Sequence, residues 1–278
     1  MNRRRVAVDL GNTRVKCWGP KRIGAQAPLR FESALHGDGW LEALLAWRAA
    51  PFFSDSSGDL HRPATADASV EWLVASVNRQ TAALIRKQIE LRFTSDVWHE
   101  LKSTDVPIKT SLHAPDAVGV DRLLAAWGAW TKLQTAVVIA DAGSALTVDW
   151  VDASGTFQGG AILPGIEMQL QALADHTPAL QGAVRQVAAE HAAGALQAPG
   201  YPGTDTVAAI ATGVYTSVAA TIEAFTTRVR QTCDAEVPLW LTGGDAVRIS
   251  QGVRVPHAVD SRLVEEAIWA VIASKSLP

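Results

Sequence analysis

The stretch Val6-Ala7-Val8-Asp9-Leu10-Gly11-Asn12-Thr13-Arg14-Val15-Lys16 decides the fold. Its apolar residues run into Asp9 and a Gly-Asn-Thr turn, which predicts a buried strand that ends in a polar turn. Gly11 has no Cβ, so backbone N–H groups and the Thr13 hydroxyl can approach a phosphate chain. Lys16 offers a compact cation for the same oxygens, and Asp9 can hold Mg²⁺ through water. A plain β-hairpin with a Gly-Asn turn accounts for the same residues.

A second stretch, residues 137–150, repeats this pattern. Four pairs of residues align at a constant separation of 132 residues: Asp9 with Asp141, Gly11 with Gly143, Asn12 with Ser144, and Trp18 with Trp150. Two apolar strands that each end in Asp-x-Gly-polar indicate a duplicated fold, with two phosphate-facing turns that meet across a cleft. Chance similarity is the alternative, because few positions match.

Composition narrows the class of protein. A chain of 278 residues can form two domains or one large one, and 48% hydrophobic with 19% charged residues is typical of a soluble globular protein. The net charge of −3 gives no reason to expect nucleic acid. Cys17 and Cys233 are isolated, which indicates neither a metal site nor a disulfide framework and fits a reducing cytoplasm.

No stretch of the sequence predicts a membrane span. The least polar long stretch, residues 206–225, contains Gly213 and Glu223, so we expect a buried Ala-rich helix there. Further helices are expected at 41–49, 81–91 and 261–273, strands at 70–77 and 237–241, and a surface loop at 54–69. This alternation of strands and helices is typical of an α/β fold.

Asp121 has two interpretations. The apolar residues at 123, 124, 127 and 130 share one face, so a helix begins near Asp121. An aspartate at a helix start is an ordinary N-cap or first-turn residue. It is also a carboxylate that could take a proton from a substrate hydroxyl.

Glycines mark three other places. Gly159 and Gly160 are predicted to lie on a strand, where they bring the backbone close to a ligand or to a packed neighbour. The stretch 242–245, Thr-Gly-Gly-Asp, suits close approach of the backbone to a nucleoside. Before the long helix, either Asp205 or Thr206 can act as the cap.

In chain order, these motifs resemble those of the type III pantothenate kinases, in the superfamily of acetate and sugar kinases, heat-shock chaperones and actin. The matching motifs are Asp9-x-Gly11-Asn12-Thr13-x-x-Lys16, Gly119-Val120-Asp121-Arg122, Asp141-x-Gly143-Ser144-Ala145-x-Thr147, Gly159-Gly160-x-Ile162-x-Pro164-Gly165, Asp205-Thr206 and Thr242-Gly243-Gly244-Asp245. The resemblance implies an α/β fold of two tandem ribonuclease-H-like (actin-like ATPase) domains with an ATP cleft between them. We place the boundary at Gly119, which gives domains of residues 1–118 and 119–278, and the C-terminal helix could cross back to the first domain. It also implies a homodimer, while the composition leads us to expect a cytoplasmic protein that binds neither nucleic acid nor membrane.

The resemblance further implies an activity, the phosphorylation of pantothenate by Mg-ATP to 4′-phosphopantothenate, the first step towards coenzyme A. Asp121 would be the general base. The ATP-binding residues would be Asp9, Leu10, Gly11, Asn12, Thr13, Arg14, Val15, Lys16 and Ser144. Asp9 would hold Mg²⁺ through water, and Asp141 would bind a monovalent cation, NH₄⁺ or K⁺. Pantothenate would contact Gly119, Val120, Asp121 and Arg122, together with Thr206 from the other subunit's side of the dimer interface.

Two residues depart from the family pattern. Ser144 stands where a threonine is usual and keeps the hydroxyl, whereas Leu112 stands where many members place a tyrosine that contacts pantothenate. The departure at Leu112 leaves open a kinase for another small hydroxyl substrate. A nucleotide-binding regulatory (transcriptional accessory) protein without kinase activity is the other alternative, because a fold alone does not determine function.

Overall fold

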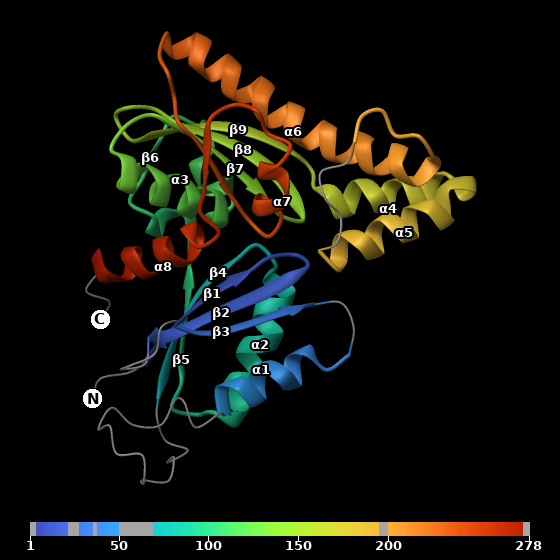
Figure 1. The fold of residues 1–278 in the computed structure, drawn as a ribbon. Coiled ribbons are helices and arrows are strands. Elements are labelled where there is room, and N and C mark those ends of the chain that lie inside the picture. The colour runs from blue at the N-terminus through green and yellow to red at the C-terminus, as the bar shows by residue number, and fades with distance from the viewer. Residues whose placement is uncertain (1–3, 22–27, 36–37, 50–68, 195–199, 275–278) are drawn as a thin grey trace. The chain divides into compact units, whose positions relative to one another are not determined.

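The computed structural model describes residues 4–21, 28–35, 38–49, 69–194 and 200–274. Its strands are β1 (Arg4–Leu10), β2 (Arg14–Lys21), β3 (Pro28–Ala34), β4 (Val70–Ser76), β5 (Val97–Leu101), β6 (Lys109–Thr110), β7 (Val137–Ala142), β8 (Ala145–Val151), β9 (Thr156–Pro164), β10 (Leu239–Thr242) and β11 (His257–Val259). Its helices are α1 (Trp40–Ala49), α2 (Arg79–Arg92), α3 (Val120–Leu133), α4 (Ile166–His176), α5 (Gln181–Ala192), α6 (Thr206–Cys233), α7 (Ala246–Ser250) and α8 (Leu263–Ser274) (Figure 1). The loop predicted at 54–69 lies, but for its last residue, outside the described residues.

The chain forms two compact units. The first comprises residues 1–106, 119–121 and 264–278, and the second comprises residues 107–118 and 122–263. The sheet of the first unit has the strand order β3-β2-β1-β4-β5, in which β1 pairs antiparallel with β2 and parallel with β4. Helices α1 and α2 pack against this sheet through Leu44, Leu45, Ala82, Ile85 and Ile89.

The sheet of the second unit repeats this topology. Its order is β11-β10-β7-β8-β9-β6, in which β7 pairs antiparallel with β8 and parallel with β10. Without the short edge strand β6, the order and the strand directions match those of the first sheet. The duplication inferred from the two Asp-x-Gly stretches is therefore confirmed, as is the predicted class of two tandem ribonuclease-H-like units.

The strand register corrects one part of the sequence alignment. Asp9 pairs with Lys16 across the first hairpin, whereas Asp141 pairs with Thr147 across the second. The second turn is therefore one residue shorter, and the separation of 132 residues holds only as far as the turn. Beyond it the counterpart of Trp18 is Asp149, so the alignment of Trp18 with Trp150 was wrong.

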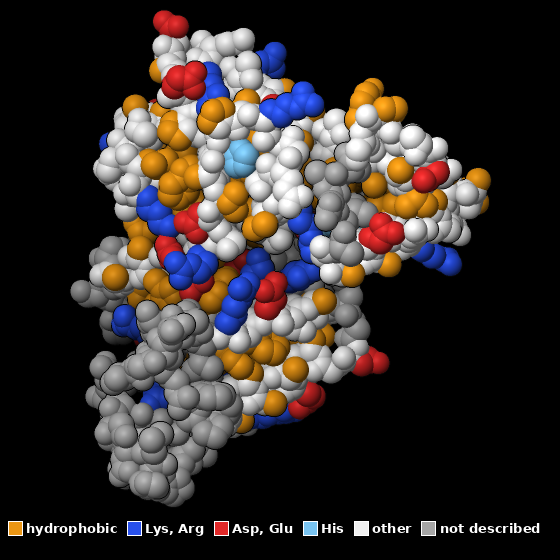
Figure 2. Space-filling model, viewed as in Figure 1, with side chains coloured by type: hydrophobic (Ala, Val, Ile, Leu, Met, Phe, Trp, Pro, Cys, Tyr) orange, Lys and Arg blue, Asp and Glu red, His pale blue; other side chains and the backbone are white. Residues whose placement is uncertain are grey.

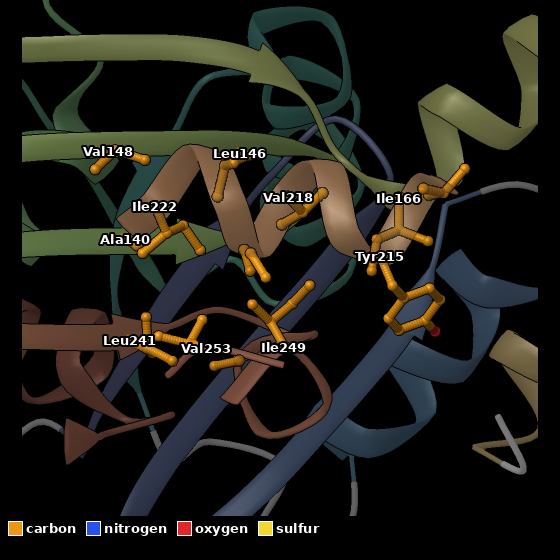
Figure 3. Close-up of a cluster of buried hydrophobic side chains, with 14 of the residues drawn as sticks. Ala140, Leu146, Val148, Ile166, Tyr215, Val218, Ile222, Leu241, Ile249 and Val253 are labelled. Carbon is orange, nitrogen blue, oxygen red and sulfur yellow. The ribbon is translucent and has the colours of Figure 1, made fainter. Parts of the chain in front are cut away.

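The core of the second unit forms where α6 packs on the sheet. In Figure 3, Val218 and Ile222 of α6 point towards side chains of β7 and β8, including Ala140 and Leu146. By length and composition alone α6 could cross a membrane, but core helices meet the same criterion. Its buried face lies in this core, as predicted for residues 206–225.

A cluster of tryptophans fills the core of the first unit. The ring centroids of Trp47 and Trp72 lie 6.5 Å apart, and those of Trp72 and Trp98 lie 6.3 Å apart. Asp96, with a fully buried side chain, accepts hydrogen bonds from Arg48 Nε (2.7 Å), Arg48 Nη2 (2.6 Å), Trp72 Nε1 (2.9 Å) and the backbone N–H of Val70 (2.9 Å). Asp96 therefore joins β4 to α1 through a desolvated ion pair.

Candidate active site

The first hairpin places a carboxylate beside an ammonium group. Asp9 is the next-to-last residue of β1, and Lys16 lies directly opposite it on β2. Asp9 Oδ2 and Lys16 Nζ are 3.9 Å apart, and their side chains are 22% and 19% exposed. The backbone N–H of Gly11 donates to Arg14 O (3.0 Å) and closes the turn.

Burial raises the pKa of Asp9 above its ordinary value, while the charge of Lys16 opposes the shift. The negative charges of Asp121 and Glu32 raise the pKa further. Asp9 and Asp121, distant in sequence, are thus close enough to interact electrostatically within the first unit. A cation bound at Asp9 would relieve this repulsion.

Asp121 lies in the first turn of α3, one residue after the helix begins at Val120, so it is a first-turn residue and not the N-cap. Its carboxylate folds back over Gly119. A Cβ built on Gly119 would overlap Asp121 Oδ1 and would lie 3.6 Å from Val77 Cγ1. The missing side chain at position 119 therefore makes the room in which this carboxylate sits.

Three of the predicted contact residues have buried side chains. Leu10, Val15 and Val120 point into the core, so any ligand contact they make comes from their backbone. Asn12 is exposed, and Arg14 Nη1 lies 3.4 Å from Glu32 Oε1. A Cβ at Gly11 would meet only Arg14 O, at 3.6 Å, so packing within the described chain does not require glycine there.

The second hairpin brings Asp141 among backbone segments. A Cβ on Gly243 would overlap Asp141 Oδ1, and one on Gly165 would overlap Gly143 O, so both glycines are required by close packing. The N–H of Gly143 donates to Ala145 O (3.1 Å), and that of Gly165 donates to Ser144 O (3.1 Å). The turn that carries Ser144 is thereby fixed against the N-terminus of α4.

The oxygen atoms beside Asp141 would suit a small cation. Asp141 Oδ1 and Ala142 O both border the space over Gly243, and the residue opposite Asp141 on β8 is the neutral Thr147 where the first hairpin has Lys16. Hard cations prefer such oxygen ligands.

In the first unit, Asp9 offers the carboxylate that water-mediated Mg²⁺ binding requires. Among the described residues, no group of three or more His, Cys, Asp and Glu side chains forms a ready-made metal site. Mg²⁺ with few protein ligands and the phosphates of ATP fits this arrangement.

The remaining glycine-rich turn is used largely by the protein itself. Asp245 Oδ1 accepts a hydrogen bond from Arg248 Nη1 (2.8 Å) and lies 3.3 Å from His191 Nε2, while His191 Nδ1 lies 2.7 Å from Tyr215 Oη. Burial and the Asp245 charge raise the pKa of Tyr215 to about 12. A Cβ at Gly244 would meet no described atom within 4 Å, so Gly244 is the position in this turn open to a ligand.

At the start of α6, the structure decides between the two candidate caps. Asp205 is the N-cap and accepts a hydrogen bond from the backbone N–H of Ala208 (2.8 Å), whereas Thr206 is the first helical residue and is exposed.

Sequence reasoning missed Asp149, the partner of the predicted contact residue Arg122. Arg122 Nε donates to Asp149 Oδ2 (3.0 Å), and Arg122 Nη2 donates to Asp149 Oδ1. The signal was available in the sequence, because Asp149 is a lone charge in a strand that otherwise reads as largely apolar.

Comparison with known proteins decides the family. The sequence pattern of the type III pantothenate kinases matches residues 5–228. The chain belongs to this family. A type III pantothenate kinase from Rhodopirellula baltica is 37% identical over 204 residues, which cover 69% of this chain and 70% of the relative. One from Persephonella marina is 26% identical over 269 residues, which cover 96% and 97%.

Solved structures support the fold alone. A putative Baf family transcriptional activator from Campylobacter jejuni is similar with a TM-score of 0.56 at 18% identity, covering 97% of this chain and 98% of that one. A putative 2-dehydro-3-deoxygalactonokinase from Sinorhizobium meliloti gives a TM-score of 0.53 at 15% identity, covering 98% and 99%. Members of this type III pantothenate kinase family are phosphotransferases. The family predicted from the motifs of the sequence is therefore confirmed.

Proposed function

We propose that this type III pantothenate kinase transfers the γ-phosphoryl group of ATP to the primary hydroxyl of pantothenate, giving 4′-phosphopantothenate, the first step of coenzyme A biosynthesis. The observation that carries the proposal is the grouping of Asp9, Lys16 and Asp121 in one unit of a chain of this family. Phosphoryl transfer depends on positioning, on charge neutralisation and on one group that accepts a proton.

The proposed mechanism assigns Asp121 the proton. The hydroxyl oxygen of pantothenate bonds to the γ-phosphorus, the bond from that phosphorus to the β,γ-bridging oxygen breaks, and ADP leaves. The hydroxyl proton passes to the Asp121 carboxylate. Lys16 and the turn between Leu10 and Val15 would hold the phosphates, and Asp9 would hold Mg²⁺ through water. Mg²⁺, when bound, neutralises charge on the phosphates.

Other residues bind and orient the substrates. In the second unit, Ser144 contributes its hydroxyl to ATP, and Asp141 holds the monovalent cation, NH₄⁺ or K⁺. For pantothenate, we propose contacts from Arg122, from Gly119 and Val120 through their backbone, and from Thr206 across a homodimer interface.

We propose that the protein works as a homodimer in the cytoplasm. Figure 2 shows hydrophobic side chains on the surface over α4, α5 and α6, and Met168 of α4 is half exposed, which suits a protein–protein contact. In the same view, positive and negative side chains are mixed over the visible surface, in line with the small net charge of −3. Such a surface suits substrates that are small molecules.

The first test measures ADP release with Mg-ATP, with and without pantothenate, and compares NH₄⁺ or K⁺ with Na⁺. We expect turnover that depends on pantothenate and on NH₄⁺ or K⁺. ATP binding without turnover under any cation would instead support the nucleotide-binding regulatory protein.

The second test concerns the general base. We expect Asp121→Asn to lose about 10²–10⁴-fold in kcat, the scale for removing such a group, while the protein stays folded. Near-normal turnover in this variant would contradict the role of Asp121.

A further inference from the structure

Asp149 is a buried carboxylate to which the proposed reaction gives no task. It lies in the middle of β8, opposite Ile139 of β7 and Gly160 of β9. Its side chain is 3% exposed, and that of its partner Arg122 is 15% exposed. Burying a carboxylate costs free energy unless it is paired and hydrogen-bonded, as Asp149 is. Apolar residues of similar volume would often give equal or greater stability, so stability alone does not explain this pair.

Gly160 makes the room for this carboxylate. A Cβ built at position 160 would overlap Asp149 Oδ1 and Val148 O, and it would lie 2.8 Å from Asp149 Cα. The close approach predicted for the paired glycines is therefore an approach to a packed neighbour. On the other side, the Arg122 guanidinium carbon lies 5.6 Å from the centre of the buried Phe157 ring.

These contacts fix the plane of the guanidinium group. Two parallel hydrogen bonds, from Nε and Nη2 to the two carboxylate oxygens, form a fork that allows one orientation. Because Asp149 also neutralises the charge of Arg122, recognition by this group depends on the direction of its N–H bonds more than on net charge.

We infer that Asp149 is a positioning residue, which orients the Arg122 guanidinium so that it can bind the anionic substrate. Pantothenate carries a carboxylate, and a planar, directed set of N–H donors is suited to that group. The inference rests on the proposed function for its substrate. It assigns Asp149 no contact with the reacting atoms.

The experiment compares the steady-state kinetics of Asp149→Asn with those of the unaltered enzyme. We expect the KM for pantothenate to rise about 10- to 100-fold, because small displacements of a positioning group have effects of this size. We expect kcat and the KM for ATP to change by less than about threefold. Asp152→Asn, the same substitution at a carboxylate three residues further on that bonds Ser154 and Gln158, should leave all three constants unchanged.

A double variant distinguishes positioning from a structural role. Arg122→Lys keeps the charge and loses the fork, so it should raise the KM for pantothenate by itself. If Asp149 acts through Arg122, adding Asp149→Asn to Arg122→Lys should raise the KM little further. The inference would be overturned if Asp149→Asn raised the KM for pantothenate by the same factor in the Arg122→Lys background as in the unaltered enzyme. An unchanged KM in Asp149→Asn alone would also overturn it.

A measurement on the unaltered protein keeps the inference testable if Asp149→Asn does not fold. The ¹⁵N NMR signal of the Arg122 Nε–H group should show slow exchange with water and should shift when pantothenate is added. Rapid exchange would contradict the fork. If the unaltered enzyme shows no pantothenate-dependent ADP release, the proposed function fails. If it does and Asp149→Asn behaves like it, the inference alone fails.

Discussion

Gly119→Ala tests whether the space over this glycine sets the position of the proposed base. The added Cβ would overlap Asp121 Oδ1 but lie 3.6 Å from both Asp121 Cγ and Val77 Cγ1, which are ordinary contacts. The backbone at position 119 does not have a positive φ, so alanine adds no backbone strain. The carboxylate oxygen must therefore move by about 1 Å while the chain around it stays in place, and a misplacement of this size can reduce a rate by about 10²-fold.

The assay is the kcat for pantothenate-dependent ADP release at saturating Mg-ATP, with the melting temperature measured on the same samples. We expect kcat to fall by about 10²-fold, close to the lower end of the effect of Asp121→Asn, with a melting temperature within a few degrees of the unaltered protein. Gly182→Ala is the matched control, because a Cβ there would meet no described atom within 4 Å. A Gly119→Ala enzyme with normal kcat, beside an inactive Asp121→Asn enzyme, would refute the reasoning.

Two further substitutions test the first unit. Burial raises the pKa of Asp9, so the ionised carboxylate destabilises the folded chain at neutral pH. Because Asp9→Asn removes this charge, the variant should have a higher melting temperature. It should also lose Mg-ATP-dependent turnover. The difference in melting temperature should vanish as the pH falls towards about 3.9, and a lower melting temperature in the variant at neutral pH would contradict this. Asp96→Asn removes the buried counter-charge that Asp96 supplies to Arg48 and should lower the free energy of unfolding by about 3–5 kcal/mol in denaturant titrations. Breaking the exposed Arg86–Glu90 pair by Glu90→Gln should change the free energy of unfolding far less, because solvent screens this pair, and an equal loss in both variants would rule out burial as the cause.

The elements of the fold could be predicted where the local pattern was strong. Apolar runs ending in Asp-x-Gly gave β1 and β7, and the apolar spacing after residue 120 gave α3. Most boundaries differ by one or two residues, whereas α6 extends well beyond residue 225, to Cys233. These are features that a few neighbouring residues determine by themselves.

The register of the second hairpin could not be predicted in this way. A turn one residue shorter changes which residues of β8 correspond to those of β2, and the sequence offers no marker of turn length there. The same slip hid Asp149, because the alignment placed Trp150 in its position. The partner of Asp149, Arg122, comes from a different element 27 residues away.

The glycines show a second limit. In the sequence, Gly11, Gly160, Gly243 and Gly244 look alike, but two of them are required by packing and two have space where a Cβ would go. The distinction depends on which atoms of distant strands lie opposite each glycine, so it emerges only from the folded chain.

The tryptophan cluster of the first unit has an optical consequence. Rings as close as those of Trp47, Trp72 and Trp98 couple their electronic transitions, so the near-ultraviolet circular dichroism of the folded protein should carry a band that depends on their mutual packing. That band belongs to the unit that carries Asp9 and Asp121. A spectrometer can therefore follow the integrity of this half of the enzyme without label, substrate or turnover.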